Sequence, residues 1–542
     1  MRASAAEKSR KLRLRTRISI ALIVALAVIS AFQTAAYAYI TFLAFATSLG
    51  GNGNDQGHAI AVDASGNVYT TGFFKSTADF DPGPDTASFT SAGNADIYVC
   101  KMDPAGNLVW ARAFGEVNGD IGYGIATGIL GRVYVTGSFQ GTVDFGPGFG
   151  VTTLTATGGG ANDDDIFVLA LTRSGNLAWV KGLGGIDHEN AWDITSDASG
   201  NVYVTGQFGG TADFDPGPGT ANLTSAGNMD IFVCKLDSAG SFVWAKAMGG
   251  VQREEGGSGI AVDGSGNVYT TGSFIGTADF DPGPGVANLT SAGGTGSSAR
   301  REIYVSKLDA AGNYVWAKAM GGTFSDEGAS IAVDPSGNVY TTGYFDSAAD
   351  FDPGPNVTTL TGIRESIFVS KLDSAGNFVW AKAMDGNSGS SGMDIAVDES
   401  GNVFTTGYFF ATVDLDPGVG TAFHTSAGHR DIFVSKLSSA GIFAWAHSMG
   451  SDTADEGTSI TVDASGKVYT TGFYAETVDF NPEYPGANIT SAGGDDIFVV
   501  KLQTHDTLPT NNTWGILLLS LGSVIAAFAI LGRNAKVRSK GD

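Results

Sequence analysis

The feature that most constrains this chain is a phrase of five residues that recurs along almost its whole length. The phrase is Val-Tyr-Thr-Thr-Gly or a near variant, and successive copies are 64 to 71 residues apart. The copies end at Gly72, Gly137, Gly206, Gly272, Gly343, Gly407 and Gly472. Self-similarity at a fixed period is typical of architectures in which each repeat stacks on its neighbours. The middle of the 542-residue chain is therefore seven copies of one unit.

Each unit reads as four antiparallel strands. In the third copy, β-branched and aromatic runs bounded by Asp and Gly predict strands at 191–196, 202–206, 230–236 and 242–248. The first and last pairs of strands are joined by short turns, and a long loop joins the middle pair. A glycine stands in the first turn of every copy, as expected where the backbone needs a positive φ.

Composition agrees with a turn-rich β protein. Glycine makes up 78 residues and charged residues only 16 per cent, which excludes a helical bundle, because glycine destabilises helix interiors. An aromatic share of 11 per cent excludes a disordered chain. The net charge is −24 and both ends are basic, so the repeats are more acidic still. A surface of this sign repels phosphate backbones, and nucleic acid is not an expected partner.

The two ends of the repeat region distinguish a closed ring from an open solenoid. The fourth strand carries a tryptophan in six copies, at Trp110, Trp179, Trp244, Trp316, Trp380 and Trp445, whereas the seventh copy stops after its third strand. The missing piece lies at the other end, where residues 44–51 align with 243–250. An N-terminal strand that completes the last blade closes the ring and removes its exposed edges. We therefore expect an all-β, monomeric, seven-bladed β-propeller of four-stranded antiparallel blades over residues 39–502.

The N-terminal segment predicts export. A basic stretch precedes an apolar run at 18–32, and Ala36-Tyr37-Ala38 matches the small-x-small pattern that signal peptidase cuts after. We predict a signal peptide over residues 1–38. The alternative is an uncleaved anchor helix, for which the apolar run is short.

The C-terminal segment predicts a membrane helix. Residues 514–531 are apolar and long enough to span a bilayer, and the basic tail at 532–542 would stay in the cytoplasm. The linker at 503–513 contains Leu508-Pro509-Thr510, and Trp514-Gly515 begins the helix. This arrangement resembles the IPTL-type and PEP-type C-terminal sorting signals. The resemblance implies recognition by a membrane-embedded sorting protease and delivery to the cell surface of a Gram-negative bacterium.

The repeats themselves resemble a known family. The stretches 331–343 (Ile-Ala-Val-Asp-Pro-Ser-Gly-Asn-Val-Tyr-Thr-Thr-Gly) and 230–237 (Asp-Ile-Phe-Val-Cys-Lys-Leu-Asp) are similar to the bacterial β-propeller repeats called SBBP. The resemblance covers about residues 41–502 and implies an exported propeller. It implies no particular chemistry.

The long loops carry paired aspartates before a Pro-Gly turn. These pairs are Asp79 and Asp81, Asp213 and Asp215, Asp279 and Asp281, Asp350 and Asp352, and Asp414 and Asp416. Carboxylates in a tight, oxygen-rich turn favour calcium, so Ca²⁺ is the candidate metal and cofactor. The alternative is that the aspartates accept local backbone N–H bonds and hold the turn. One loop alone does not supply the six to eight oxygens that calcium takes.

A second series of acids lies five residues before the isoleucine of each first strand. Its members are Asp55, Asp120, Glu189, Glu255, Asp326 and Asp455, with Ser390 in the remaining copy. Connection order places both series on one face, as an acidic rim. We expect this rim to bind a glycan or protein partner.

Catalytic signals are weak. The six histidines fall at unrelated positions of the repeat, and motifs such as His-Glu-x-x-His are absent from the sequence. The sharpest cluster, Asp187-His188-Glu189, is interpreted as a solvated loop. The repeat is expected to keep its symmetry, and its main insertion, at 294–301, to lie in a peripheral loop. Cys100 and Cys234 share one position of the third strand, too far apart for a disulfide, and are expected to be buried thiols.

The sequence therefore predicts a non-enzymatic binding or scaffold protein at the cell surface, anchored by its C-terminal helix, with no catalytic residue assigned. The alternative is an enzyme on a propeller scaffold, a lyase or glycosidase acting in the central cleft.

Overall fold

The computed structural model describes residues 40–146, 150–158, 164–252, 256–294, 300–481 and 486–505. Over these ranges the chain is all-β, apart from one short 3₁₀ turn at Ile129–Gly131. Within the same ranges there is no helix of the length and hydropathy needed to cross a membrane. The predicted signal peptide, with Ala36 and Ala38, and the predicted sorting motif and membrane helix lie outside the described residues.

Each repeat forms a four-stranded antiparallel sheet, which we call a blade and name by its first strand. In the β24 blade, β24 (Glu327–Val333) pairs with β25 (Val339–Asp350), β25 with β26 (Thr359–Leu372), and β26 with β27 (Phe378–Gly386). In the first turn, Gly337 adopts a φ of 80°, which glycine reaches without steric cost. The four strands that the sequence predicts for a unit are present in this blade.

The same order of strands recurs along the chain. The other blades are built from β2 (Gln56–Val62), β3 (Val68–Phe74), β6 (Asp96–Met102) and β7 (Leu108–Phe114); β8 (Ile121–Thr127), β9 (Val133–Phe139), β12 (Asp165–Leu171) and β13 (Leu177–Gly185); β14 (Glu189–Ser196), β15 (Val202–Asp213), β16 (Asn222–Leu236) and β17 (Phe242–Gly250); β18 (Gly256–Val262), β19 (Val268–Ile275), β22 (Arg301–Leu308) and β23 (Tyr314–Gly322); β28 (Ser390–Val397), β29 (Val403–Asp414), β30 (Phe423–Leu437) and β31 (Phe443–Met449); and β32 (Glu456–Val462), β33 (Val468–Tyr474), β36 (Asp496–His505) and β1 (Ile40–Gly51).

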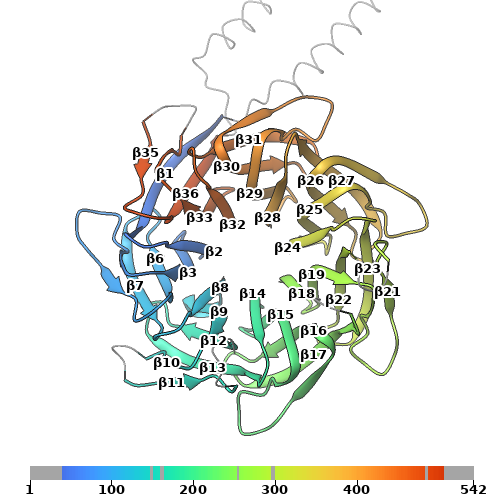
Figure 1. Ribbon diagram of the computed structural model, residues 1–542, viewed down its shortest axis with the longest axis horizontal. Helices are drawn as coiled ribbons and strands as arrows, with labels where there is room; N and C mark the ends of the chain where they lie inside the picture. The colour runs from blue at the N-terminus through green and yellow to red at the C-terminus, as the bar shows by residue number, and fades with distance from the viewer. Residues whose placement is uncertain are drawn as a thin grey trace, which may run out of the picture. The chain divides into compact units, whose positions relative to one another are not determined.

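The blades of the unit formed by residues 43–503 are arranged around a centre that the first strands surround (Figure 1). Strand β1, from the N-terminal end, lies beside β36 and completes the order β32-β33-β36-β1. Tyr474 Oη donates a hydrogen bond to Ser48 Oγ (2.8 Å), and Ser48 Oγ donates one to Asp496 (3.4 Å). This is the position that the sequence predicts for the N-terminal strand.

The long loops contain short strands that the sequence did not predict. In the β2 blade, β4 (Thr77–Asp79) pairs with β5 (Ser88–Thr90), and the hydroxyls of Thr77 and Thr90 are 2.8 Å apart. The same hairpin pairs with the end of the neighbouring blade's fourth strand, where Gly50 lies opposite Asp79. Comparable hairpins are β10 (Thr142–Asp144) with β11 (Thr153–Thr155), β20 (Thr277–Asp279) with β21 (Asn288–Thr290), and β34 (Thr477–Asp479) with β35 (Asn488–Thr490). The hairpins that begin with β4 and β20 therefore join adjacent blades, whereas β10-β11 and β34-β35 form separate two-stranded sheets.

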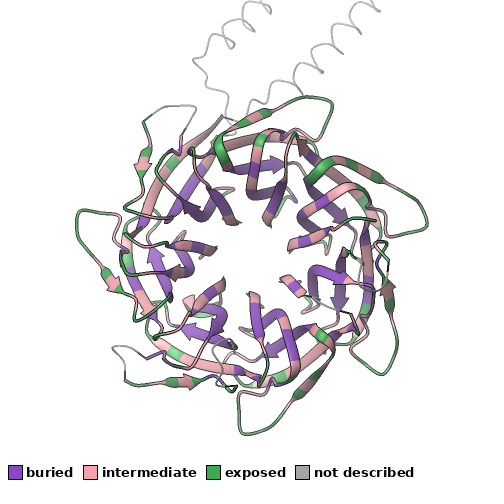
Figure 2. Ribbon diagram, in the orientation of Figure 1, coloured by how far each residue is buried: buried purple, intermediate pink, exposed green. Residues whose placement is uncertain are grey.

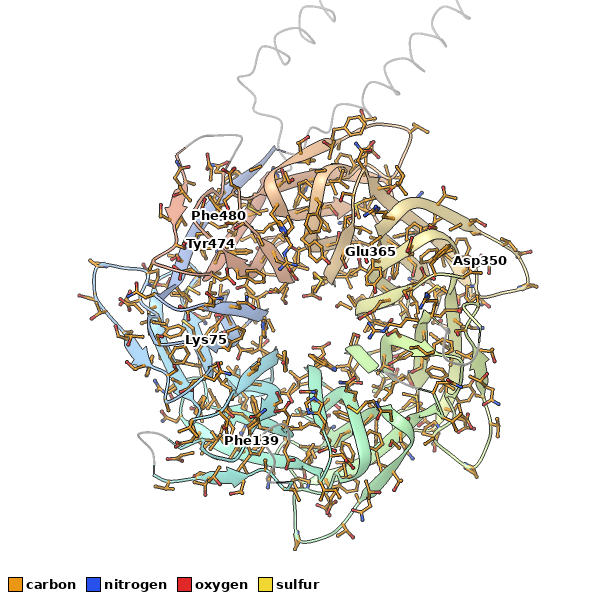
Figure 3. The ribbon with its side chains drawn as sticks, viewed as in Figure 1. Lys75, Phe139, Asp350, Glu365, Tyr474 and Phe480 are labelled. Atoms are coloured by element: carbon orange, nitrogen blue, oxygen red, sulfur yellow. The ribbon has the colours of Figure 1, made fainter. Side chains whose placement is uncertain are left out.

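The hydrophobic core lies between neighbouring blades. Tyr134 of the β8 blade packs in one cluster with Phe208, Phe214 and Phe232 of the β14 blade. The ring centroids of Phe214 and Phe232 are 4.9 Å apart. Figure 2 shows this buried interior along the strands and the exposed hairpins outside it, and Figure 3 labels Phe139 and Phe480 within it. Stacking of blades thus supplies the core that a single sheet lacks.

Polar contacts also tie each blade to the next. Lys371 Nζ lies 4.7 Å from the centroid of the Tyr340 ring and donates a hydrogen bond to the Ser439 carbonyl oxygen (3.3 Å). Trp380 Nε1 donates to the same carbonyl (3.2 Å). Lys101, Lys235, Lys307 and Lys501 make equivalent bonds to the following blade.

Cys100 and Cys234 are free and buried, which confirms the interpretation of both as buried thiols.

Candidate functional site: the central cavity

The paired aspartates of the long loops bind their own loop backbone. Asp79 Oδ1 accepts hydrogen bonds from the N–H groups of Asp81 (3.0 Å) and Ala87 (2.8 Å), and Asp81 accepts one from Gly83 (2.8 Å). The same pattern holds Asp213 and Asp215, Asp279 and Asp281, Asp350 and Asp352, and Asp414 and Asp416. Among the residues with described positions, no three His, Cys, Asp or Glu side chains are grouped to hold a metal ion. These contacts favour turn capping, and calcium binding stays a prediction.

The acids that precede each first strand lie in the interior. Asp326 is fully buried, and its carboxylate accepts hydrogen bonds from the N–H groups of Gly322 (2.6 Å) and Asp346 (2.9 Å). It thereby ties the fourth strand of one blade to the second strand of the next. Asp55, Asp120 and Asp455 are equally buried and accept backbone N–H bonds in the same way. Glu189 is also buried and accepts a bond from the Gly185 N–H group, whereas Glu255 lies outside the described residues. At the described positions, this series does not form an exposed rim that a ligand could reach.

A second buried carboxyl group, at the start of the third strand, accompanies most of these acids. Burial raises the pKa of both Asp96 and Asp120 to about 6, and the charge of Asp96 adds to the shift of Asp120. Corresponding pairs are Asp496 with Asp55, Glu302 with Asp326, and Asp431 with Asp455. Where the β24 blade meets the β28 blade, both acids are replaced, by Ser366 and Ser390. The joint replacement indicates that the two groups form one structural unit.

The centre of the ring is a cavity of about 860 Å³. Every first strand contributes to its wall the residue two positions before a shared isoleucine. These wall residues are His58, Tyr123, Trp192, Ser258, Ala329, Met393 and Thr458. No two of them are alike, although the isoleucine is present in all the copies. The expectation that the repeat keeps its symmetry is therefore wrong at the axis, because packing fixes the isoleucine and leaves the neighbouring position free to vary.

Three adjacent blades form an aromatic wall on one side of this cavity. The rings of His58 and Tyr123 are stacked, with centroids 5.3 Å apart and an interplanar angle of 2°. The Tyr123 and Trp192 centroids are 4.7 Å apart at 55°. Burial lowers the pKa of His58 to about 4, so its ring is neutral at neutral pH. His58 Nδ1 lies 3.1 Å from the Gly122 carbonyl oxygen, a hydrogen bond that the neutral ring donates.

A hollow adjoins this wall where the neighbouring first strand lacks bulky side chains. Strand β18 begins Gly256-Gly257-Ser258-Gly259, and Gly256 and Ser258 line the cavity. Gln207 and Asn228 line it beside Trp192. We call the space bounded by Trp192, Gln207, Asn228, Gly256 and Ser258 the glycine-rich hollow. It combines one flat aromatic side chain with uncharged polar groups.

The charged groups of the cavity are already paired within the protein. Arg301 Nη1 lies 2.9 Å from Glu327 Oε2. Asp193 accepts hydrogen bonds from the N–H groups of Ile194 (2.7 Å) and Ile260 (2.8 Å), and burial raises its pKa to about 7. Arg301 is the last residue of the insertion that was expected to be peripheral, and it lines the cavity. Of the two labelled acids of the β24 blade, Glu365 lies nearer the centre of the ring than Asp350 (Figure 3).

Asp394 occupies the corresponding position on the opposite side of the axis from Asp193. Its carboxylate accepts hydrogen bonds from the hydroxyls of Ser330 (2.6 Å) and Ser459 (2.7 Å) and from the N–H groups of Ile395 (2.8 Å) and Ile460 (2.8 Å). Burial raises its pKa above the usual range. The four donors satisfy both oxygens, so Asp394 joins three blades rather than presenting a free carboxylate.

The cluster Asp187-His188-Glu189 is divided between the cavity and the interior. His188 lines the cavity, and its Nδ1 lies 3.2 Å from Asp164. Asn190 Nδ2 lies 2.9 Å from His188 Nε2, and Glu189 is buried. The interpretation of this cluster as a solvated loop is therefore incomplete, because the histidine is held at the cavity wall.

Sequence reasoning overlooked the wall position, although a signal was present. When the copies are aligned on the isoleucine of the first strand, the residue two positions earlier is different in each one. The signal was easy to miss, since only the ring geometry brings these residues together.

A family model for the SBBP β-propeller repeat matches residues 45–72 and 315–351. An uncharacterized WD repeat-containing protein, L264, of Acanthamoeba polyphaga mimivirus is 22% identical over 471 residues, which cover 74% of this chain and 33% of that protein. The regulatory protein FlaEY of Caulobacter vibrioides is 24% identical over 284 residues, covering 50% and 28%. The chain thus matches about a third of the length of these curated relatives.

Two solved structures match this chain at low identity and low TM-score. The WD40 β-propeller domain of Doa1 matches with a TM-score of 0.37 and 9% identity, over 85% of this chain and 97% of that one. Sqt1 from Chaetomium thermophilum matches with a TM-score of 0.38 and 11% identity, over 86% and 99%. The strand pairing within each repeat and the family-model match together make this chain a β-propeller repeat protein.

Proposed function

We propose that this protein is a seven-bladed propeller, closed by β1, that binds its ligand in the central cavity without transforming it. The observation that carries this proposal is the wall position, which differs in every blade while the isoleucine beside it is constant. Cavities with a few convergent polar groups and aromatic side chains are the usual sites of small ligands. The ligand is a small molecule, or the terminal unit of a larger one, with one flat apolar face.

A binding role is supported over an enzymatic one by the state of the cavity's acids. A lyase or glycosidase needs a carboxyl group or another base within reach of the substrate. Four donors occupy both oxygens of Asp394, and each oxygen of Asp193 accepts one backbone N–H bond. Glu327 is paired with Arg301.

The proposed site of action is outside the cytoplasm. It is supported by the predicted signal peptide and the predicted C-terminal membrane helix with its sorting motif. In this proposal the propeller is carried to the cell surface, where its cavity is open to ligands in the surroundings.

The test is a thermal-shift screen of the full chain in a zwitterionic detergent, with neutral sugars, amino acids and nucleotides as probes. Ser258→Trp places a bulky side chain in the cavity, and Ser265→Trp, on an exposed turn of the same blade, is the matched control. A cavity ligand raises the Tm of the wild type and of Ser265→Trp but not of Ser258→Trp. If every stabilising compound acts equally on the three proteins, the cavity is not the binding site and the proposal is wrong.

A further inference from the structure

We infer that the glycine-rich hollow binds a neutral pyranose sugar stacked on Trp192, an inference that rests on the proposed function. A pyranose ring presents C–H groups on one face and hydroxyl groups around its edge. It therefore needs an aromatic plane on one side and uncharged hydrogen-bonding groups around it. The hollow supplies both.

The aromatic plane is held in place by its neighbours. The ring centroid of Trp192 lies 4.7 Å from that of Tyr123. The Tyr123 ring is in turn stacked on His58, with centroids 5.3 Å apart. In the next blade, the first strand lines the cavity with Gly256 and Ser258, whereas Gly257 and Gly259 pack closely against the neighbouring blades. The indole is thus held by Tyr123, and the two small residues of the adjoining strand leave space in the cavity.

The uncharged polar groups of the hollow are available to a ligand. Within the described ranges, the side-chain amides of Gln207 and Asn228 form no hydrogen bond to the protein, although both line the cavity. An amide offers two donors and an acceptor, which suits the hydroxyl groups of a sugar. Ser258 adds a hydroxyl on the same wall.

The charges around the hollow argue against an ionic ligand. Among the described residues that line the cavity, the one Lys or Arg is Arg301, which is paired with Glu327 at 2.9 Å, so neither attracts an opposite charge strongly. Asp193, the nearest carboxylate on the Trp192 strand, accepts two backbone N–H bonds. A phosphate would have to compete with Glu327 for Arg301, whereas a neutral hydroxylated ring needs no charged partner.

The hollow has space that a substitution can fill without disturbing the strand. A Cβ atom added at Gly256 would have one neighbour within 4 Å, Gln207 Oε1 at 3.5 Å. The corresponding position carries glutamate in β24 and β32, so a longer side chain is compatible with the strand. Gly256→Leu therefore blocks the hollow while leaving Trp192 in place.

The experiment titrates the full chain, in a zwitterionic detergent, with the methyl glycosides of glucose, galactose and mannose. Choline and glucuronate serve as the cationic and anionic probes. Calorimetry gives the Kd, and quenching of tryptophan fluorescence reports the contact with Trp192. An oligosaccharide of the sugar that binds then distinguishes a free sugar from the terminal unit of a chain.

We expect at least one neutral glycoside to bind saturably, and Trp192→Ala and Gly256→Leu each to weaken it at least tenfold. Trp244→Phe, on an outer strand, is the matched control and should change the Kd less than twofold. The melting profile of each variant confirms that it is folded. Gly256→Leu retains the indole and changes only the space beside it. Loss of binding in this folded variant as well as in Trp192→Ala would therefore show that the sugar needs the hollow itself.

Two outcomes would overturn the inference in distinguishable ways. If only choline, glucuronate or a compound from the wider screen binds, and Ser258→Trp abolishes that binding, the sugar is wrong and the cavity stands. If a sugar binds the wild type, Trp192→Ala and Ser258→Trp equally well, both the hollow and the cavity are wrong. Failure of all the neutral glycosides to bind the folded wild type also refutes the sugar.

Discussion

The paired carboxyl groups at the blade junctions predict that this protein is most stable in mild acid. Burial raises the pKa of Asp96, Asp120 and Asp326 to about 6, above the usual 3.8. Groups of this kind bind more protons in the folded than in the unfolded state. Their stabilisation is complete below the unfolded pKa and is lost as the pH rises through about 6. Stability should therefore increase as the pH falls from 7 toward 5.

The aspartates of the first turns set the lower limit of this range. Burial alone would raise the pKa of Asp63, but hydrogen bonds from Asn67 and Tyr69 leave it below the usual value. The stabilisation from such a group is present above its unfolded pKa and is lost as the pH falls through its lower folded pKa. His58 and His447, whose pKa burial lowers to about 4, oppose the gain as well, because the unfolded state binds their protons first as the pH falls below about 6.5. These opposing effects limit the gain in stability on the acid side.

The magnitude follows from the size of the shift. A carboxyl group whose pKa rises by about 2 units costs about 3 kcal/mol when fully ionised in the folded protein. Lowering the pH from 7 to 5 recovers about 1 kcal/mol of this for each group. For the Asp96 and Asp120 pair the gain is about 2 kcal/mol, and the pairs at the other junctions contribute further.

The natural junction with Ser366 and Ser390 suggests the variant. We expect the double substitution Asp96→Ser and Asp120→Ser to reduce the gain between pH 7 and pH 5 by about 2 kcal/mol. Urea unfolding followed by tryptophan fluorescence at a series of pH values measures it, and the difference between pH values is the quantity compared. Asp103→Ser is the matched control, because hydrogen bonds keep the pKa of this exposed turn aspartate low despite some burial. It should leave the gain unchanged.

The prediction fails if the wild type is equally stable or less stable at pH 5 than at pH 7. It also fails if the double serine variant retains the whole gain. The second result would mean that other groups cause the pH dependence and that the junction carboxyls remain ionised.

Three further predictions concern the ring and its loops. Deletion of residues 41–49 should remove the strand that pairs with β36, and thereby lower the Tm by several degrees or more and cause association through the open edge. Thermal scans and light scattering measure these effects, and a monomer with an unchanged Tm would contradict the prediction. Lys371→Met should cost about 1 to 2 kcal/mol in urea unfolding, because it removes the bond to the Ser439 carbonyl, whereas Lys382→Met should cost less than 0.5 kcal/mol. Asp279→Ala should lower the free energy of unfolding by about 1 to 3 kcal/mol, because two N–H groups lose their acceptor. The loss should be the same with and without millimolar calcium, and a loss seen only with calcium would indicate a metal site.

Much of the fold follows from the sequence because its determinants are local and repeated. The turn around Gly337 needs a positive φ, and the alternation of apolar residues in β24 and β25 sets the strands. The displaced fourth strand at the N-terminus predicted the pairing of β1 with the last sheet. The hairpins of the long loops were not predicted, because strands of three residues, such as Thr77–Asp79, are too short to show a period.

The role of the acids was harder to predict, because the same residue type serves both a surface site and an interior bond. Asp326 was assigned to a rim from the connection order, which places its backbone correctly at the junction of two blades. Burial of its side chain depends on the neighbouring blade, whose contacts a single unit does not contain. A hint was present in Ser366 and Ser390, since acids at an exposed rim have no reason to change together.

The cavity wall shows why repetition conceals the site. A repeat is recognised by what its copies share, and the shared residues of the first strand, such as Ile260, are those that packing requires. The residue that faces the axis has no partner that is the same in every blade, so its type differs between copies. It is therefore treated as variation when the repeat is defined. Ring closure then brings these discarded positions together, which places Trp192 next to Tyr123 although 69 positions separate them in the chain. In a closed ring of similar blades, specificity is therefore best sought at the position where the copies agree least.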